Sequence, residues 1–262
     1  MTMRLIDLSS SIDASQWEPE PVSHEIVTPA EGAAHMAKEM REHFGLDFDT
    51  AELPDGELLS IDNMSLNTHT GTHIDAPSHY GSRAGYGDGR PRNIDELPLD
   101  WFHRPAFVLD FTGVEGPATL TADDIAKELA RIGYQPQPMD IALLHTGADR
   151  FKGSQAFFTD FIGLDASATH FLLDLGIKVI GTDAFSLDAP FGHILRGYAA
   201  TKDQGVLWPA HFIGRDREFC QIERLERLGD LPEPYGFTLS CLPVKIAGAG
   251  AGWTRAAAIF ED

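Results

Sequence analysis

The chain has 262 residues, 43% of them hydrophobic and 23% charged, so it can bury a large core without disulfide bonds. Its formal net charge of −20 argues against nucleic acid or an anionic membrane as a partner, because both are bound through basic residues. Its two cysteines, Cys220 and Cys241, are too few for a disulfide framework or a thiolate zinc site, and no apolar run approaches the roughly 20 residues of a membrane span. We therefore expect a cytoplasmic protein that acts on a small molecule.

The N-terminal quarter predicts short strands at residues 5–9, 22–28 and 58–66. Residues 30–44 carry apolar side chains at helical spacing, and Gly45 follows the last of them. Glycine is common just after a helix because it adopts the left-handed conformation at little cost. We therefore predict a helix over 30–44.

The segment His69-Thr-Gly-Thr-His73-Ile-Asp75-Ala-Pro-Ser-His79 places three histidines and an aspartate within eleven residues. Neutral imidazole and carboxylate are the usual ligands of zinc, manganese or iron(II). All four side chains fall on odd positions, so an extended backbone turns them to one face. The segment predicts a metal site.

Distances separate the roles within this segment. In a strand, His73 and Asp75 lie roughly 6.6 Å apart and can bind one ion. His69 would lie about 13 Å from His73 in a straight chain, so the backbone must bend, and Gly71 provides that freedom. His79, beyond a proline, is better suited to proton transfer or to supporting the ligands than to being a fourth ligand.

Two other interpretations of the segment are possible. The chain has eleven histidines, so some clustering can be accidental. A helical zinc-protease motif is disfavoured because HExxH needs a glutamate that is missing here, and Thr-Gly-Thr is a poor helix sequence.

The remaining sequence alternates predicted helices and strands, which is typical of an α/β fold with a mixed sheet flanked by helices. Thr121 and Asp124 form a candidate capping box for a helix over 122–132, and a second helix is predicted over 166–175. Residues 81–91 form a glycine-rich loop that we expect to be mobile at the mouth of the site. Without repeats or a clear linker, a single domain over 1–262 is expected. Strands are predicted at 106–111, 140–145, 177–181, 219–222, 237–244 and 255–260.

Further ligands must come from elsewhere in the chain. His211 lies between two strand-like segments, with residues 210–214 themselves short and ambiguous, and Glu223 ends the strand-like run from Phe219. In a strand Glu223 points opposite to Cys220, which makes that cysteine a packing residue. Taken alone, His211 and Glu223 fit surface or salt-bridge roles at least as well.

The segment from His69 to His79 resembles the signature of the cyclase-like metal-dependent hydrolase family, which includes bacterial kynurenine formamidases and isatin hydrolases. The similarity extends to the opening Leu-Ile-Asp-Leu-Ser, to Gly-Thr-Asp-Ala-Phe-Ser-Leu-Asp at 181–188, to the spacing of His211 and Glu223, and to the closing Pro-Val-Lys-Ile-Ala-Gly-Ala-Gly-Ala-Gly-Trp.

This resemblance implies a swivelling β/β/α domain, usually a homodimer whose neighbouring subunit helps to close the site. It implies one ion held by His69, His73 and Asp75, with Asp75 and Glu223 bridging to a second ion that His211 also binds. Zinc and manganese both suit this ligand set, and one or two ions are possible.

The resemblance also implies that His79 is the acid/base residue. Formamidases carry Trp-Pro-Gly near the substrate, and the resemblance implies that Trp17 is the corresponding substrate-binding residue, although Glu18 and Pro19 follow it here. The length of the chain and the helix over 30–44 are closer to isatin hydrolase, for which one manganese is expected.

The expected reaction is hydrolysis of an amide C–N bond, in an N-formyl arylamine or a cyclic amide, by metal-activated water with His79 moving the proton. An ester or lactone hydrolase, or a lyase or cyclase, would use the same residues. A metal-binding protein without turnover is the remaining alternative, and a free base beside the ions argues against it.

Overall fold

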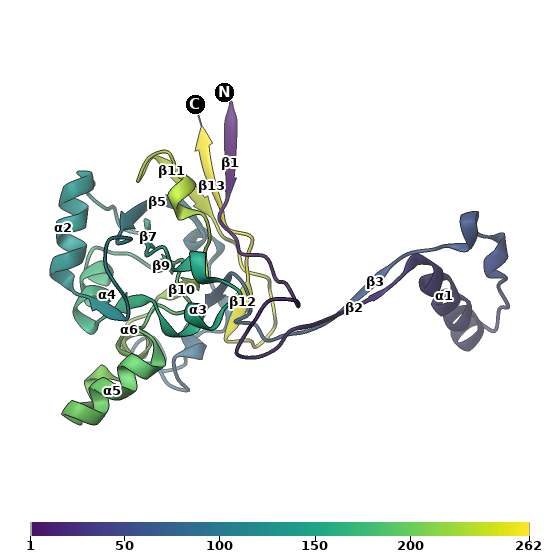
Figure 1. Ribbon diagram of the computed structural model, residues 1–262, viewed down its shortest axis with the longest axis horizontal. Helices are drawn as coiled ribbons and strands as arrows, with labels where there is room; N and C mark the ends of the chain where they lie inside the picture. Colours follow the sequence, from purple (N-terminus) through teal and green to yellow (C-terminus); the bar gives the residue numbers. More distant parts are fainter. Residues whose placement is uncertain (1, 262) are drawn as a thin grey trace. The chain divides into compact units, whose positions relative to one another are not determined.

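The computed structural model describes residues 2–261, and within it the chain forms two compact units (Figure 1). Of the described residues, the larger unit comprises 2–12 and 68–261, and the smaller comprises Asp13–Asn67. The sequence thus inserts the smaller unit between the first strand and the metal-site segment. That the two function as a single domain stays a prediction.

A nine-stranded mixed sheet organises the larger unit. The four central strands run parallel to one another, and the strands on both sides of them are antiparallel. The order across the sheet is β1 (Met3–Asp7), β13 (Ala257–Glu261), β11 (Phe237–Ser240), β5 (His103–Asp110), β7 (Ile141–His145), β9 (Val179–Thr182), β10 (Cys220–Glu223), β4 (His73–Asp75) and β12 (Ala251–Trp253).

Helices and one small strand pair complete this unit. The pair is parallel and joins β6 (Ala118–Leu120) to β8 (Ile162–Leu164). The helices are α2 (Ala122–Ile132), α3 (Gln155–Thr159), α4 (Ala166–Asp174), α5 (Phe191–Thr201) and α6 (Pro209–Ile213). None of the described helices combines the length and apolar character needed to cross a bilayer.

Two hydrophobic clusters occupy opposite faces of the central strands, because successive side chains in a strand alternate between faces. In β5, Phe107 and Leu109 belong to one cluster and Val108 to the other. Helices α2 and α4 cover the face of Phe107, contributing Ile125 and Leu172. The mixed sheet flanked by helices confirms the predicted fold class.

The ends of α2 follow the sequence prediction. The Thr121 side chain accepts a hydrogen bond from the Asp124 N–H, and the Asp124 carboxylate accepts one from the Thr121 N–H. Gly133 ends the helix in the left-handed conformation, at φ 68°. Local sequence signals were sufficient to predict where α2 begins, because capping hydrogen bonds involve only neighbouring residues.

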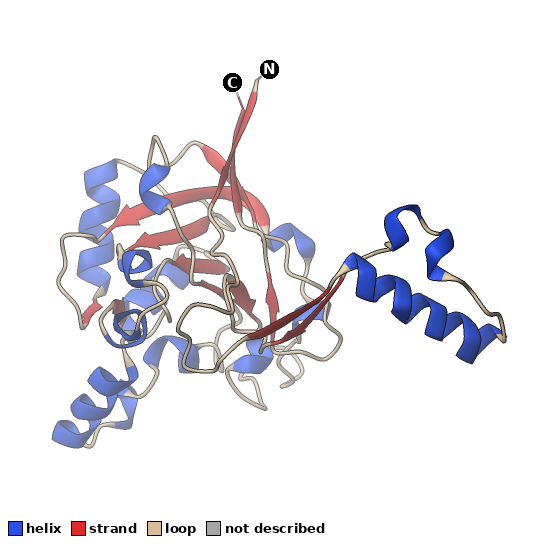
Figure 2. Ribbon diagram, turned by 45° about the vertical axis from the view of Figure 1, so that its right-hand side comes forward, coloured by secondary structure: helices blue, strands red, loops and turns tan. Residues whose placement is uncertain are grey.

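The smaller unit contains an antiparallel ribbon, one long helix and two short 3-10 helices at Thr50–Glu52 and Pro54–Gly56 (Figure 2). Strand β2 (Ser23–Val27) pairs with β3 (Ile61–Ser65), and α1 (Pro29–Phe44) lies between them in the sequence. Thr28 and Glu31 form a capping box at the start of α1, and Gly45 ends it. Nearly every residue of both strands is exposed.

The C-terminal half differs from expectation at one place that matters for function. The sequence assigned no clear secondary structure to residues 210–214. In the structure, the short helix α6 (Pro209–Ile213) covers this stretch and carries His211. Proline favours the first position of a helix because it needs no N–H there. The backbone of this helix start is held by Asp188, a contact distant in sequence.

Candidate metal centre

Strand β4 and the turns on either side of it build the centre of the site. Gly71 adopts φ 68°, and this left-handed turn brings His69 back beside His73, as the sequence predicts. Because β4 pairs with β10 in antiparallel register, His73 lies opposite Glu223, and Asp75 lies opposite Gln221. The four side chains therefore share one face of the sheet.

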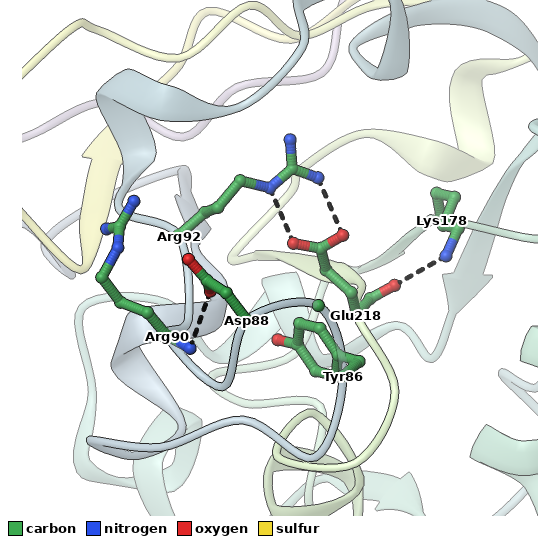
Figure 3. Close-up of a pocket in the computed structure, with 7 residues that line it drawn as sticks. Tyr86, Asp88, Arg90, Arg92, Lys178 and Glu218 are labelled. Atoms are coloured by element: carbon green, nitrogen blue, oxygen red, sulfur yellow. Dashed lines mark hydrogen bonds and ion pairs between the residues drawn. The ribbon is translucent and has the colours of Figure 1, made fainter.

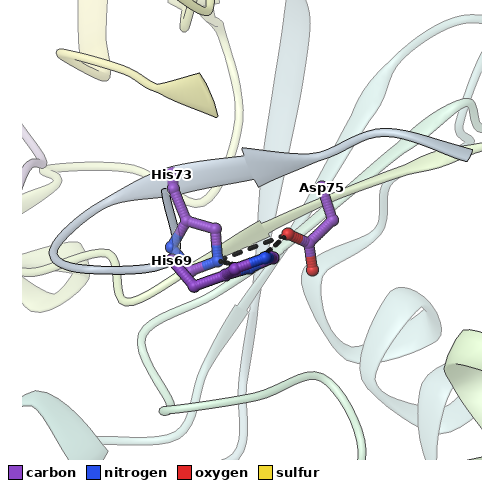
Figure 4. Close-up of side chains that lie close together, drawn as sticks. All are labelled: His69, His73 and Asp75. Atoms are coloured by element: carbon purple, nitrogen blue, oxygen red, sulfur yellow. Dashed lines mark hydrogen bonds and ion pairs between the residues drawn. The ribbon is translucent and has the colours of Figure 1, made fainter. Parts of the chain in front are cut away.

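His69, His73 and Asp75 converge on a single point (Figure 4). His69 Nδ1 lies 3.2 Å from His73 Nε2 and 3.0 Å from Asp75 Oδ1, and His73 Nε2 lies 3.4 Å from the same oxygen. Ligands bonded to a tetrahedral ion at about 2.0–2.2 Å are separated from one another by about 3.3–3.6 Å. The triangle nearly matches this spacing.

The His73 ring is oriented for this role. Its Nδ1 lies 2.9 Å from the carbonyl oxygen of Gly71, so Nδ1 carries the proton and donates it to that oxygen. The Nε2 lone pair is then left for an ion. Fixing one ring nitrogen to a backbone carbonyl is a common way to orient a metal-binding histidine.

A second cluster shares the carboxylate of Asp75. Its other oxygen, Oδ2, lies 3.7 Å from His211 Nε2 and 3.9 Å from His79 Nε2. The two oxygens of Asp75 thus face two different groups of imidazoles. Such a carboxylate can bind one ion or bridge two.

Glu223 lies between the two clusters. Its Oε2 is 3.7 Å from His73 Nε2, and its Oε1 is 3.9 Å from His211 Nε2. Oε1 also accepts hydrogen bonds from Ser186 Oγ at 3.1 Å and from the Leu187 N–H at 3.0 Å.

The donor set fits a divalent cation. Asp75 is fully buried, and neither of its oxygens receives a hydrogen bond of good geometry from the described residues. A buried carboxylate without such partners is costly unless a positive charge compensates it. Imidazole nitrogens and carboxylate oxygens around it are the ligand types that zinc and manganese bind.

The ionisable groups respond differently to this environment. Burial opposes ionisation of Asp75, but His73 and the other imidazoles outweigh it and hold the pKa well below its usual value. Burial and the charge of Asp75 raise the pKa of Glu223. Burial, followed by the neighbouring imidazoles, lowers the pKa of His79 to about 4, although Asp75 acts in the opposite direction. In this environment the His79 ring is neutral near pH 7.

Seven site residues were predicted, and the structure gathers five of them around a sixth, Asp75. Trp17 belongs to the smaller unit and is 40% exposed, so its substrate contact stays a prediction. The individual roles of the other residues are also predictions. The residues gathered around Asp75 are His69, His73, His79, His211 and Glu223.

Sequence reasoning missed the residues that hold His211 and Glu223. Asp188 contacts His211, and Ser186 contacts Glu223. Both lie within the stretch 181–188 that carries part of the family resemblance. An aspartate and a serine within that stretch were the available signal for these contacts.

The glycine-rich loop over residues 81–91 lines a cavity of about 520 Å³ that is separate from the residues around Asp75 (Figure 3). None of the seven predicted site residues lines this cavity. Arg92 forms two hydrogen bonds to Glu218, at 2.7 and 2.8 Å, and Lys178 Nζ donates to the Glu218 carbonyl. That the loop is mobile and opens the metal site stays a prediction.

The sequence is similar to a known protein family and to several curated proteins. A family model described as a putative cyclase matches residues 6–189. Kynurenine formamidase from Salinibacter ruber is 28% identical over 202 residues, covering 77% of this chain and 81% of the formamidase. Cyclase-like protein 1 from Arabidopsis thaliana is 26% identical over 270 residues, covering 96% of this chain and 92% of the relative.

Solved structures confirm the fold. An isatin hydrolase bound to the product analogue thioisatinate superposes with a TM-score of 0.74 at 23% identity, covering 99% of this chain and 93% of that one. Isatin hydrolase A from Labrenzia aggregata, bound to benzyl benzoate, gives a TM-score of 0.73 at 23% identity, with 99% and 94% covered.

Proposed function

The chain belongs to the putative cyclase family, and from that premise we propose that it is a metal-dependent hydrolase of a non-peptide amide C–N bond. The observation that carries the proposal is the buried Asp75 carboxylate, whose two oxygens face converging imidazoles and lack good hydrogen bonds from the described residues. The kynurenine formamidase and isatin hydrolase among its relatives and structural neighbours support the same chemistry.

His69, His73 and Asp75 would hold one ion, and Asp75, His211 and Glu223 would complete its coordination or bind a second. The arrangement of one Asp75 oxygen toward each group supports both possibilities. We propose zinc or manganese, since the set of imidazoles and carboxylates suits either ion.

A divalent cation held by these residues would supply Lewis-acid chemistry, lowering the pKa of bound water towards about 7. The protein residues orient and move the proton. His79, 35% exposed at its side chain, is the imidazole best placed to meet a substrate entering from solvent. It takes the proton from the attacking water and returns it to the leaving nitrogen.

We propose an N-formyl arylamine or a cyclic amide as the substrate, by analogy with the formamidase and the isatin hydrolases. An ester or lactone hydrolase, or a lyase that abstracts a carbon-bound proton, would use the same cation and base. Only the chemistry of the product distinguishes these reactions.

We also propose that the protein is a homodimer in which a second copy covers the smaller unit. A two-stranded ribbon is at best marginally stable alone, and exposed apolar patches mark interaction surfaces. Light scattering should show a dimer at micromolar concentration; a monomer would contradict this. The large apolar side chains exposed in this unit include Ile26, Phe44, Leu46, Phe48, Leu59, Ile61 and Met64.

The test of function begins with metal content by elemental analysis, followed by a panel of formanilides, cyclic amides, esters and lactones. Turnover in ¹⁸O-labelled water should place the label in the product carboxylate. Chelation with EDTA should abolish turnover, and added Zn²⁺ or Mn²⁺ should restore it. Turnover that is unaffected by complete removal of metal would contradict the proposal.

A further inference from the structure

Asp188 is a fully buried carboxylate that contacts one of the predicted ligands. Its Oδ1 accepts a hydrogen bond from the Ala210 N–H at 2.7 Å. Its Oδ2 accepts from the His211 N–H at 3.1 Å and lies 2.5 Å from His211 Nδ1. One side chain thus holds both the start of α6 and the imidazole that the helix carries.

The backbone around Asp188 is fixed by packing. The Leu187 carbonyl accepts a hydrogen bond from the Leu164 N–H of β8 at 2.8 Å. Gly163 lies so close that a Cβ there would be 2.2 Å from the carbonyl carbon of Asp188. The carboxylate therefore sits on a rigid segment.

The same segment also positions Glu223. The Leu187 N–H and the Ser186 hydroxyl both donate to Glu223 Oε1, and Asp188 follows immediately. Three consecutive residues, Ser186 to Asp188, therefore contact the two predicted ligands that lie outside the segment from His69 to His79, namely His211 and Glu223.

We propose that Asp188 is a positioning residue for the metal centre, an inference that rests on the proposed metal-dependent function. By accepting a hydrogen bond from the Nδ1–H group, its carboxylate fixes the tautomer of His211 and directs the Nε2 lone pair toward Asp75. Groups that orient metal-binding histidines in this way contribute about 10–100-fold to metal affinity.

The substitution Asp188→Asn separates this role from simple packing. Asparagine keeps the shape but has one acceptor oxygen, whereas Asp188 accepts on both of its oxygens. An amide group must therefore turn its NH₂ toward either the Ala210 N–H or the His211 side. We expect the dissociation constants for Zn²⁺ and Mn²⁺ to rise about 10–100-fold, measured by competition with a chromogenic chelator.

Asp183 provides a matched control from the same stretch. It is also fully buried, and it accepts hydrogen bonds from the Thr146 N–H and hydroxyl and from the Gly147 N–H. Asp183→Asn should change the melting temperature of the chelated protein without changing metal affinity. Equal losses of metal affinity in Asp188→Asn and Asp183→Asn would show that Asp188 contributes only to packing, and this would overturn the proposal.

A double-mutant cycle tests whether Asp188 acts through His211. In a His211→Ala background, Asp188→Asn should have little further effect on metal affinity. An undiminished effect in that background would overturn the proposal.

A measurement on the unmodified protein covers the case in which Asp188→Asn fails to fold. Long-range ¹H–¹⁵N spectra of the zinc-loaded protein should show His211 protonated at Nδ1 and metal-bound at Nε2. Coordination through Nδ1 would overturn the assignment of Asp188. If the wild-type chain bound neither ion, the proposed function would fail as well, whereas tight wild-type binding with unchanged affinity in Asp188→Asn would contradict this inference alone.

Discussion

Asp75 connects the two halves of the site because its two oxygens face different imidazoles. One faces His69 and His73 at 3.0 and 3.4 Å, and the other faces His211 and His79 at 3.7 and 3.9 Å. Single substitutions at this scale should therefore separate metal binding from proton transfer.

Replacing Asp75 should release the metal. Asp75→Asn keeps the shape of the side chain but removes the negative charge that both imidazole groups surround. We expect elemental analysis of the purified variant to show most of the bound ion lost. Full metal occupancy in Asp75→Asn would show that the predicted ligand set is wrong.

Replacing His79 should slow catalysis and leave the metal bound. His79→Ala removes the proposed proton carrier, which typically costs about 10²–10⁴-fold in kcat/KM. His24→Ala is the matched control, because His24 pairs with Asp62 on the exposed ribbon of the smaller unit. Unchanged turnover in His79→Ala, or a loss of metal, would remove its acid/base assignment.

At the scale of elements, the site depends on how the turn before β4 folds back. Gly71 permits the left-handed conformation that places His69 over His73, and a Cβ at this position would lie 2.8 Å from Ile12 Cγ1. The geometry of one backbone turn therefore sets the distance between two predicted ligands.

A comparison of two glycines tests this dependence. Gly71 and Gly133 both have φ 68°, but Gly133 ends α2, and a Cβ added there would meet no atom within 4 Å. Each change to alanine should destabilise the fold by about 1–2 kcal/mol in urea unfolding. Only Gly71→Ala should also weaken metal binding; equal metal affinity in the two variants would show that the turn does not position His69.

At the scale of the whole molecule, the chain has a formal net charge of −20, and several of its carboxylates are buried in the fold. Asp183 is the one whose ionisation should most clearly affect stability away from the proposed metal ligands. Burial raises its pKa to about 6 despite hydrogen bonds from Thr146 that act in the opposite direction.

The pH dependence follows from this raised pKa. The folded protein holds the Asp183 proton more tightly than the unfolded chain, whose carboxyl has the usual pKa of 3.8. The contribution of protonated Asp183 to the free energy of unfolding is thus complete below about pH 4, and it is lost as the pH rises through about 6. Asp183→Asn cannot titrate, so wild type should lose on the order of 2–3 kcal/mol relative to this variant between about pH 4 and 7.

Urea unfolding of both proteins in EDTA measures this difference without a contribution from bound metal. A difference in unfolding free energy that stays constant with pH would show that Asp183 has an ordinary pKa.

Much of the site was determined by the sequence itself. His69, His73, Asp75 and His79 lie within eleven residues, so one turn and one short strand suffice to bring them together. The bend at Gly71, the end of α1 at Gly45 and the capping box of α2 followed from local backbone preferences. The family and the mixed α/β sheet were also predicted, and both are confirmed.

Only the tertiary structure decided how His211 and Glu223 join that segment. Glu223 reaches His73 because β10 pairs with β4, and His211 reaches Asp75 because Asp188 holds the start of α6. These contacts join residues 22 to 150 positions apart, and local propensity carries no information about such pairing. The separation of residues 13–67 into a compact unit likewise depends on how the chain packs, because no change of composition marks its ends.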